Sequence, residues 1–525
     1  MTKDNTEEYE KIYQELMKLH SIEGLAFDKV MQKIGYLIDL SDILNKEEGS
    51  ERAINLGQEF LDLEISELQK AEMHYFIGNA YSTRWKMSKE KGHGLWIHNW
   101  DNDLIERIIL NLRRSYSSNA FHELPEYRKL QILHNLANIL DTVGRPIKAL
   151  KYYNELLKFE SKFGMALGNR AFTESLYSNS LYDYGHRNLF MSFVRSDLET
   201  VCHQDSDLIF EYGAKSKFKL YLDDLIHSHN GSIIEQNWNL YNHNLGETKE
   251  EQNYRKWVLK NKLFLNPLND LGSFPIASQD ILHLPTHTTP LTTGPKFLGA
   301  FNQIKQSYVS ARFLLYENMF SEELHFSDKR VLLYDTLDYP NYSLRIEKLK
   351  MSFRLLYGLF DQIAFFLNDY FELGINEKGI TFLKFWYEKK GILREKLTER
   401  KNRPLQGLFW ISKDLFEQKE DFNLLLNPEA RDLKYIRNCL EHRYLKVHTY
   451  YIEPKDEITR GISFDSLAFS IEEQMLIKKT LSLVSLVREA IIYASLSIKE
   501  ESNTKNSNLD TIPHFPVIMN EDFKR

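Results

Sequence analysis

Apolar residues recur at helical spacing along most of the chain, and this pattern predicts an all-α fold. In the C-terminal half the spacing predicts helices at about 300–318, 344–373, 380–398, 405–419, 429–447 and 470–499. The stretch from Arg354 to Glu372 is apolar on nearly every side, which is typical of a helix in the centre of a bundle. Residues 299–503 are therefore expected to form a helical bundle, followed by a polar tail at 504–525.

The front half, residues 1–262, contains pairs of shorter amphipathic helices joined by turns. The clearest pair lies between Leu130 and Leu157, around the turn Gly144-Arg145. Further helices of the same kind are expected at 53–68 and 76–81, and a third, irregular pair at 168–171 and 177–185. These pairs resemble tetratricopeptide repeats with irregular spacing, which stack into a curved solenoid that usually binds a partner on its concave side.

Between the two halves, residues 263–298 are rich in Pro, Gly, Thr and Asn and have no sustained helical period. Such a composition predicts a linker or an ordered loop between domains. Its length favours a segment that packs on the rest of the protein.

A candidate catalytic motif lies near the end of the predicted helix 429–447, where Arg437 is followed after four residues by His442. An RNA strand carries its own nucleophile, the ribose 2′-OH, so a protein that cuts it needs a proton carrier and a group that stabilises the phosphate. Imidazole titrates near neutrality, and guanidinium is a permanent cation with a planar fork of donors. The pair therefore fits metal-free RNA cleavage. The spacing equally fits a solvated helix face with an ion pair between Arg437 and Glu441.

The surroundings of the motif add candidate residues. Leu433, Ile436, Leu440 and Val447 repeat at helical spacing and predict the buried face. The segment 431–455 holds six Lys and Arg against three acids, a local charge of +3, and we expect it to attract phosphate. The residues expected to contact RNA are Lys434, Arg443, Lys446 and His448. Two further Arg–His pairs have similar spacing, Arg443/His448 and Arg128/His134.

One polar stripe interrupts the apolar helix 344–373, formed by Arg354, Asp361 and Asn368 at seven-residue spacing. This stripe faces either the solvent or the motif helix. In the second case Asp361 would orient His442 or hold Arg437 in place.

Arg437-Asn438 and Glu441-His442, together with segments at 306–312, 355–375 and 404–410, resemble the HEPN superfamily. The closest resemblance is to bacterial members in which a tetratricopeptide-like front precedes a C-terminal HEPN domain. It implies a metal-independent endoribonuclease of toxin or antiviral-defence type, with Arg437 and His442 catalytic and Asn438 and Glu441 supporting them. It further implies a homodimer through the bundle with two motifs across one cleft, no cofactor, and a protein partner or phage trigger on the repeats. Other HEPN proteins are inactive or bind nucleotides, so a non-catalytic adaptor is the alternative.

Composition limits the remaining function classes. A chain of 525 residues with a net charge of −7 is a poor nonspecific DNA-coating protein. Two cysteines and a polar, acidic start predict a cytoplasmic protein, and Arg488 and Glu489 interrupt the apolar stretch 481–498, so no membrane span is expected. His93 and His98, near Asp101 and Asp103, match no compact zinc pattern, and no Gly-rich phosphate loop occurs.

Overall fold

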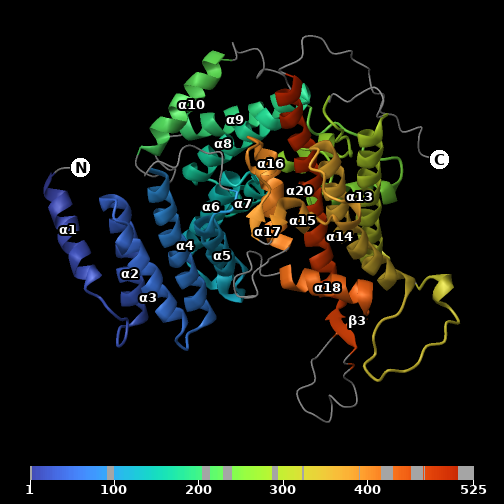
Figure 1. Ribbon diagram of the computed structural model, residues 1–525, viewed down its shortest axis with the longest axis horizontal. Helices are drawn as coiled ribbons and strands as arrows, with labels where there is room; N and C mark the ends of the chain where they lie inside the picture. Colours follow the sequence, from blue (N-terminus) through green and yellow to red (C-terminus); the bar gives the residue numbers. More distant parts are fainter. Residues whose placement is uncertain are drawn as a thin grey trace.

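The computed structural model (Figure 1) describes residues 3–90, 100–203, 213–228, 239–286, 294–321, 324–389, 391–415, 430–450, 465 and 467–506. Helices dominate these residues, whose strands form only two small two-stranded sheets, and this confirms the all-α fold. The front half comprises α1 (Lys3–Met17), α2 (Phe27–Leu44), α3 (Glu47–Leu61), α4 (Glu67–Glu90), α5 (Asp103–Ser117), α6 (Glu126–Thr142), α7 (Pro146–Phe159), α8 (Gly164–Ser180), α9 (Tyr184–His203) and α10 (Ala214–Ser228), with a 3₁₀ turn at Asn119–Glu123.

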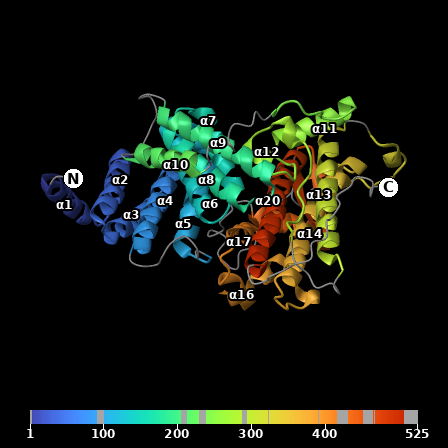
Figure 2. The same ribbon diagram turned by 90° about the horizontal axis from the view of Figure 1, so that it is seen from above.

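Consecutive helices of the front half pack on one another, and α1 to α5 form a row that leads away from the N-terminus (Figures 1 and 2). The pair expected between Leu130 and Leu157 is present as α6 and α7. The helix expected at 53–68 instead ends at Leu61, and a short loop separates it from α4.

The turn between α6 and α7 depends on a glycine. Gly144 has a φ of +80°, and its N–H donates to the carbonyl of Asp141, which closes the end of α6. Pro146 then begins α7, where a missing N–H costs nothing. A Cβ on Gly144 would lie 2.5 Å from the carbonyl oxygen of Arg403, and one on Gly407 would lie 2.1 Å from the carbonyl oxygen of Gly144. The turn between α6 and α7 therefore packs directly on the backbone of the C-terminal half.

The C-terminal half is a bundle preceded by α11 (Lys249–Lys260) and α12 (Leu268–Leu271). Its long helices are α13 (Lys296–Phe320), α14 (Leu344–Tyr370), α17 (Arg403–Leu415), α18 (Ala430–His442) and α20 (Glu473–Asn506). α20 lies in the middle and packs against α13, α14 and α17 (Figure 1). By length and composition α20 could cross a membrane, but 83% of its most apolar window is buried inside the protein.

Two predicted helices are wrong in part. The segment 380–398 contains only short elements: α15 (Phe382–Trp386), a hairpin of β1 (Tyr387–Lys389) and β2 (Ile392–Leu393), and α16 (Glu395–Thr398). The helix predicted at 429–447 ends at His442. Residues that were expected to continue it form β3 (Tyr444–His448), which pairs in parallel with β4 (Ala468–Glu472). Val447 is therefore buried in a strand and not on the apolar face of a helix.

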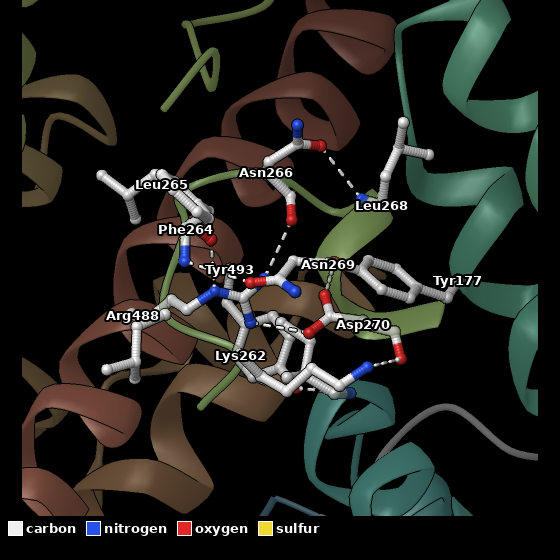
Figure 3. A network of polar contacts seen from close by, with 12 residues as sticks. Tyr177, Lys262, Phe264, Leu265, Asn266, Leu268, Asn269, Asp270, Arg488 and Tyr493 are labelled. Carbon is white, nitrogen blue, oxygen red and sulfur yellow. Dashed lines mark hydrogen bonds and ion pairs between the residues drawn. The ribbon is translucent and has the colours of Figure 1, made fainter. Parts of the chain in front are cut away.

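One hydrophobic core cluster runs from Ala71 in the repeats to Ile498 in α20, so the two halves share a core. In the segment between them, residues 263–271 are buried with it. Arg488 on α20 donates to the carbonyl oxygens of Phe264 at 2.5 Å and Asn266 at 2.9 Å. It also donates to Asp270 at 2.6 Å, and Asp270 accepts from the Tyr177 hydroxyl of α8 at 3.0 Å (Figure 3). Residues 264–270 thus connect the front half to the bundle through buried hydrogen bonds.

A second buried cluster joins the halves directly. Arg145, next to the glycine turn, donates to Asp414 of α17 at 2.5 Å and to Glu489 of α20 at 2.8 Å. Arg113 of α5 donates to both carboxylate oxygens of the same Asp414. Burial by itself raises the pKa of Asp414, but the charges of Arg113 and Arg145 lower it to about 2. The four side chains balance their charges inside a region that excludes water.

Candidate active site

The motif helix α18 is positioned by its apolar face. Leu433, Ile436 and Cys439 are buried, and the helix packs against α14 and α17. Arg437 and Asn438 lie at the margin of this face and are half-buried, whereas Glu441 and His442 are exposed. The helix therefore presents its motif on the side that faces α14 and the solvent.

Arg437 rests against α14. Its Nη1 donates to the Asn438 side-chain oxygen at 3.1 Å, and its guanidinium carbon lies 5.8 Å from the centre of the Tyr357 ring. Burial raises the pKa of Tyr357, and the nearby charge of Arg437 opposes this shift. Among the described residues no carboxylate forms an ion pair with Arg437, so its charge is held in place by a ring and an amide and is not neutralised by direct contact.

Asp361 lies one turn along α14 from Tyr357, and its carboxylate accepts the backbone N–H of Phe382 at 2.8 Å. Burial raises the pKa of Asp361, and the Phe382 hydrogen bond and the charge of Arg437 partly offset the rise. Asp361 is thus within electrostatic reach of Arg437. No hydrogen bond links it to His442 in the described part of the chain, so of its two expected roles we keep only that of positioning Arg437.

The polar stripe of α14 does not face a single environment. Asn368 is buried and exchanges two hydrogen bonds of 3.0 Å with the backbone of Ile375. Arg354 points outward and contacts Glu441 at 3.4 Å, with half of the Arg354 side chain exposed. Glu441 therefore pairs with α14 and not with Arg437 on its own helix. An exposed pair of this kind contributes about 0–1 kcal/mol, so it adds little to the stability of the site.

His442 is the last residue of α18 and is exposed. Within the described ranges it makes no hydrogen bond or ion pair, and no contact joins it to Arg437. Lys434 and Arg443 are also exposed. The imidazole and these two cations are accordingly accessible to a polyanion.

Lys446 and His448 do not fit their expected role in RNA contact. Lys446 is 3% exposed and pairs with Asp338 at 2.7 Å and Asp465 at 3.3 Å. His448 is 2% exposed and lies 3.2 Å from the Ser470 hydroxyl, and its burial lowers its pKa. Both side chains are buried because the chain after His442 forms the strand β3, which pairs with β4, and does not continue the exposed helix. We therefore remove them from the RNA-contacting set, and Arg443/His448 is not a second motif.

The pair Arg128/His134 is structural. Arg128 pairs with Glu72 at 3.4 Å and stacks over the Tyr75 ring at 4.0 Å. His134 is buried and contacts the Asn169 amide at 3.0 Å. Burial lowers the pKa of His134 to about 4. His93 and His98 lie outside the described residues, and within the described ones no group of three or more His, Cys, Asp or Glu is placed to hold a metal ion.

Tyr357 is the site residue that the sequence pattern does not reveal, because it counts as one more apolar position of a core helix. A signal exists in its spacing. Tyr357 lies three residues after Arg354 and four before Asp361, so the three residues share one face of α14.

Fold and site together define an all-α protein whose C-terminal bundle carries an Arg–x₄–His motif at the exposed end of a helix. Residues 288–501 match the family model of the LA2681-like HEPN domain. This part of the chain is therefore a HEPN domain, and the expected superfamily is confirmed. No curated protein and no solved structure matches the chain. The family match covers the bundle and does not extend to the front half.

Proposed function

We propose that the protein is a metal-independent endoribonuclease, with Arg437 and His442 as its catalytic residues. The observation that carries the proposal is the state of the motif in this HEPN domain. The His442 imidazole is exposed, and Arg437 packs against Tyr357 with no carboxylate in direct contact among the described residues. A guanidinium that is fixed but not neutralised is suited to bind a phosphate.

In the proposed reaction a 2′-OH loses its proton to an imidazole and attacks the adjacent phosphorus. The bond to the 5′-oxygen breaks, and that oxygen receives a proton. The products are a 2′,3′-cyclic phosphate and a 5′-hydroxyl. Arg437 stabilises the charge on the phosphate oxygens in the transition state. Asn438 positions the guanidinium through its 3.1 Å hydrogen bond, and the charge of Asp361 stabilises the cation electrostatically.

A single imidazole cannot remove one proton and deliver another in the same step. The proposed enzyme is therefore a homodimer through the bundle, in which two copies supply two motifs to one cleft. Lys434 and Arg443, exposed on the same helix and just beyond it, are the proposed RNA contacts. We further propose a role in toxin or antiviral defence, with the repeat region binding the protein partner or phage trigger.

The test is cleavage of a labelled RNA by the purified full-length protein. We expect His442→Ala and Arg437→Ala each to lower the cleavage rate by at least about 100-fold, the range for losing a general acid–base or a charge-stabilising group. Arg437→Lys should recover little, because an ammonium lacks the planar fork of donors. His122→Ala is the matched control, since His122 is exposed and lies in the repeats. Wild-type rates in His442→Ala, or no cleavage by the wild type, would favour the adaptor alternative.

A further inference from the structure

An aromatic pair lies beside the motif, at the edge of the bundle where α18 and β3 pack together (Figure 1). Tyr435 of α18 is 43% exposed, and its ring meets the ring of Phe469 in β4 at a centroid distance of 4.7 Å and an interplanar angle of 85°. Phe469 is half-buried and packs on the hydrophobic core of the bundle. The edge-on contact therefore holds the Tyr435 ring against the protein, while part of that ring stays open to solvent.

The flank of α18 that carries Tyr435 is fixed to the rest of the bundle. Asp432, three residues before Tyr435, pairs with Lys479 of α20 at 2.9 Å. β4, which carries Phe469, ends at Glu472, and α20 begins at the next residue. Both supports of Tyr435 thus lead to the central helix. A ring that is already fixed in this way loses little conformational entropy when a ligand binds to it.

Tyr435 lies on the same stripe of α18 as His442. Seven residues separate them, which is close to two helical turns, so their side chains leave the helix within about 20° of each other. The two ends of this stripe are about 10 Å apart along the helix axis. A short strand bound at His442 can therefore reach the Tyr435 ring with a base a few positions away.

A cation lies at each end of the stripe. Lys434 precedes Tyr435, Arg443 follows His442, and both are exposed. Proteins bind single-stranded nucleic acid by this combination, in which cations hold the phosphates and aromatic rings stack on the bases. In a duplex the bases are stacked and paired inside the helix, so RNA-binding aromatic side chains stack on unpaired bases. The residues along α18 therefore favour an unpaired strand.

We propose that Tyr435, held by Phe469, is a stacking platform for one nucleobase of a single-stranded RNA. The base lies on the open part of the Tyr435 ring, Lys434 holds an adjacent phosphate, and the strand continues toward His442. A stack uses the face of a base and not its hydrogen-bonding edge, so the platform selects unpaired RNA with little preference among the four bases. Its role in cleavage, which is to place a ribose beside the His442 imidazole, rests on the proposed ribonuclease activity.

The first experiment measures the binding of a labelled, mixed-sequence single-stranded RNA to full-length His442→Ala, the parent protein for this test. In this parent Tyr435→Ala should weaken binding about 5- to 150-fold, the range for the loss of one base–aromatic stack. Tyr435→Phe keeps the ring and should bind like the parent. Tyr435→Leu keeps the apolar bulk without an aromatic face and should bind like Tyr435→Ala. Tyr36→Ala is the matched control, because Tyr36 is 50% exposed on helix α2.

Two further ligands separate stacking from a general disturbance of α18. One is a strand with the same number of ribose phosphates and no bases, and the other is a fully paired duplex of the same sequence. Neither offers a free base face, so the parent and Tyr435→Ala should bind each of them equally. Equal binding of the single strand by the two proteins would overturn the platform. An equally large loss on the strand without bases would also overturn it, because the lost contact would then not be a stack.

The second experiment measures RNA cleavage by Tyr435→Ala with His442 intact. The substitution should raise KM and leave kcat unchanged, because a stacked base is held equally in the ground state and the transition state. A protein that binds RNA through Tyr435 but cuts none would leave the platform standing and reject the enzyme. Cleavage by Tyr435→Ala with the wild-type KM would reject the platform and leave the enzyme standing.

Discussion

Replacing Arg145 with methionine tests whether the repeats and the HEPN bundle unfold as one body. The substitution keeps most of the side-chain length but leaves Glu489 without its 2.8 Å partner and Asp414 with Arg113 alone. The residues Arg145, Glu489 and Asp414 are at most 4% exposed, so the uncompensated charge stays in the interior. Breaking a buried pair by removing one member typically costs about 3–5 kcal/mol.

The expected change in melting temperature depends on the size of the cooperative unit. At about 2.1 cal/mol/K per residue, 525 residues have an unfolding entropy of about 1.1 kcal/mol/K, so the loss corresponds to about 3–5 °C. If residues 288–501 unfolded alone, the entropy would be about 0.45 kcal/mol/K, and their transition would fall by about 7–11 °C. Because the two halves share a core, we predict the smaller shift in one transition.

The assay is differential scanning calorimetry of the wild type and the variant. Arg84→Met is the control, since the Arg84–Glu47 pair is partly exposed and its loss should cost at most about 1 kcal/mol. Adding Glu489→Met to Arg145→Met restores charge balance and should recover part of the stability. A melting temperature within 1 °C of the wild type in Arg145→Met would refute the reasoning, and two separated transitions would refute the single cooperative unit.

Two further predictions concern pH and RNA contact. The folded-state pKa of His134, about 4, lies below its ordinary value of 6.5, so its contribution is complete above pH 6.5 and is lost as the pH falls toward 4. At pH 4.5 the stability lost in this way is roughly 2–3 kcal/mol. The melting temperature of His134→Gln should therefore fall less between pH 7 and 4.5 than that of the wild type. Equal falls in melting temperature would contradict the assignment. Arg443→Ala should leave the melting temperature unchanged and reduce by about 1 the slope of the logarithm of the RNA-binding constant against the logarithm of the salt concentration. Lys446→Met should lower the melting temperature, because Asp338 and Asp465 lose their partner, and should leave that slope unchanged. The reverse pattern in filter binding and calorimetry would show that the strand residues, and not the helix end, contact RNA.

Periodicity was sufficient to predict the long helices because their apolar faces are local patterns. It failed after His442, where Leu440 and Val447 continue a helical spacing by coincidence. The strand forms because its pairing partner lies at 468–472, beyond the range of any local pattern. Lys446 is buried for a similar reason, since Asp338, its counter-ion, is 108 residues away. Sequence reasoning assigns such a lysine to the surface because it cannot locate the distant carboxylate.

The connector and the site illustrate the same limit. The composition around Asn266 and Asp270 predicts a loop, yet both residues are buried because Arg488 of α20 donates its hydrogen bonds to that segment. At the site, the spacing of Arg437 and His442 could be recognised from the sequence alone, and the HEPN match supports the family to which that spacing pointed. The part played by Tyr357 required the packing of α18 on α14, which no spacing within either helix specifies.

The most direct test of the central claim is cleavage of one RNA, in the presence of EDTA, beside the same RNA with a single 2′-deoxyribose at the mapped cut position. If Arg437 and His442 act on the ribose hydroxyl, the all-ribose strand is cut at its normal rate to a 2′,3′-cyclic phosphate, and the substituted strand is intact at that position. Cleavage at the deoxyribose, or loss of all cleavage with EDTA, would contradict it.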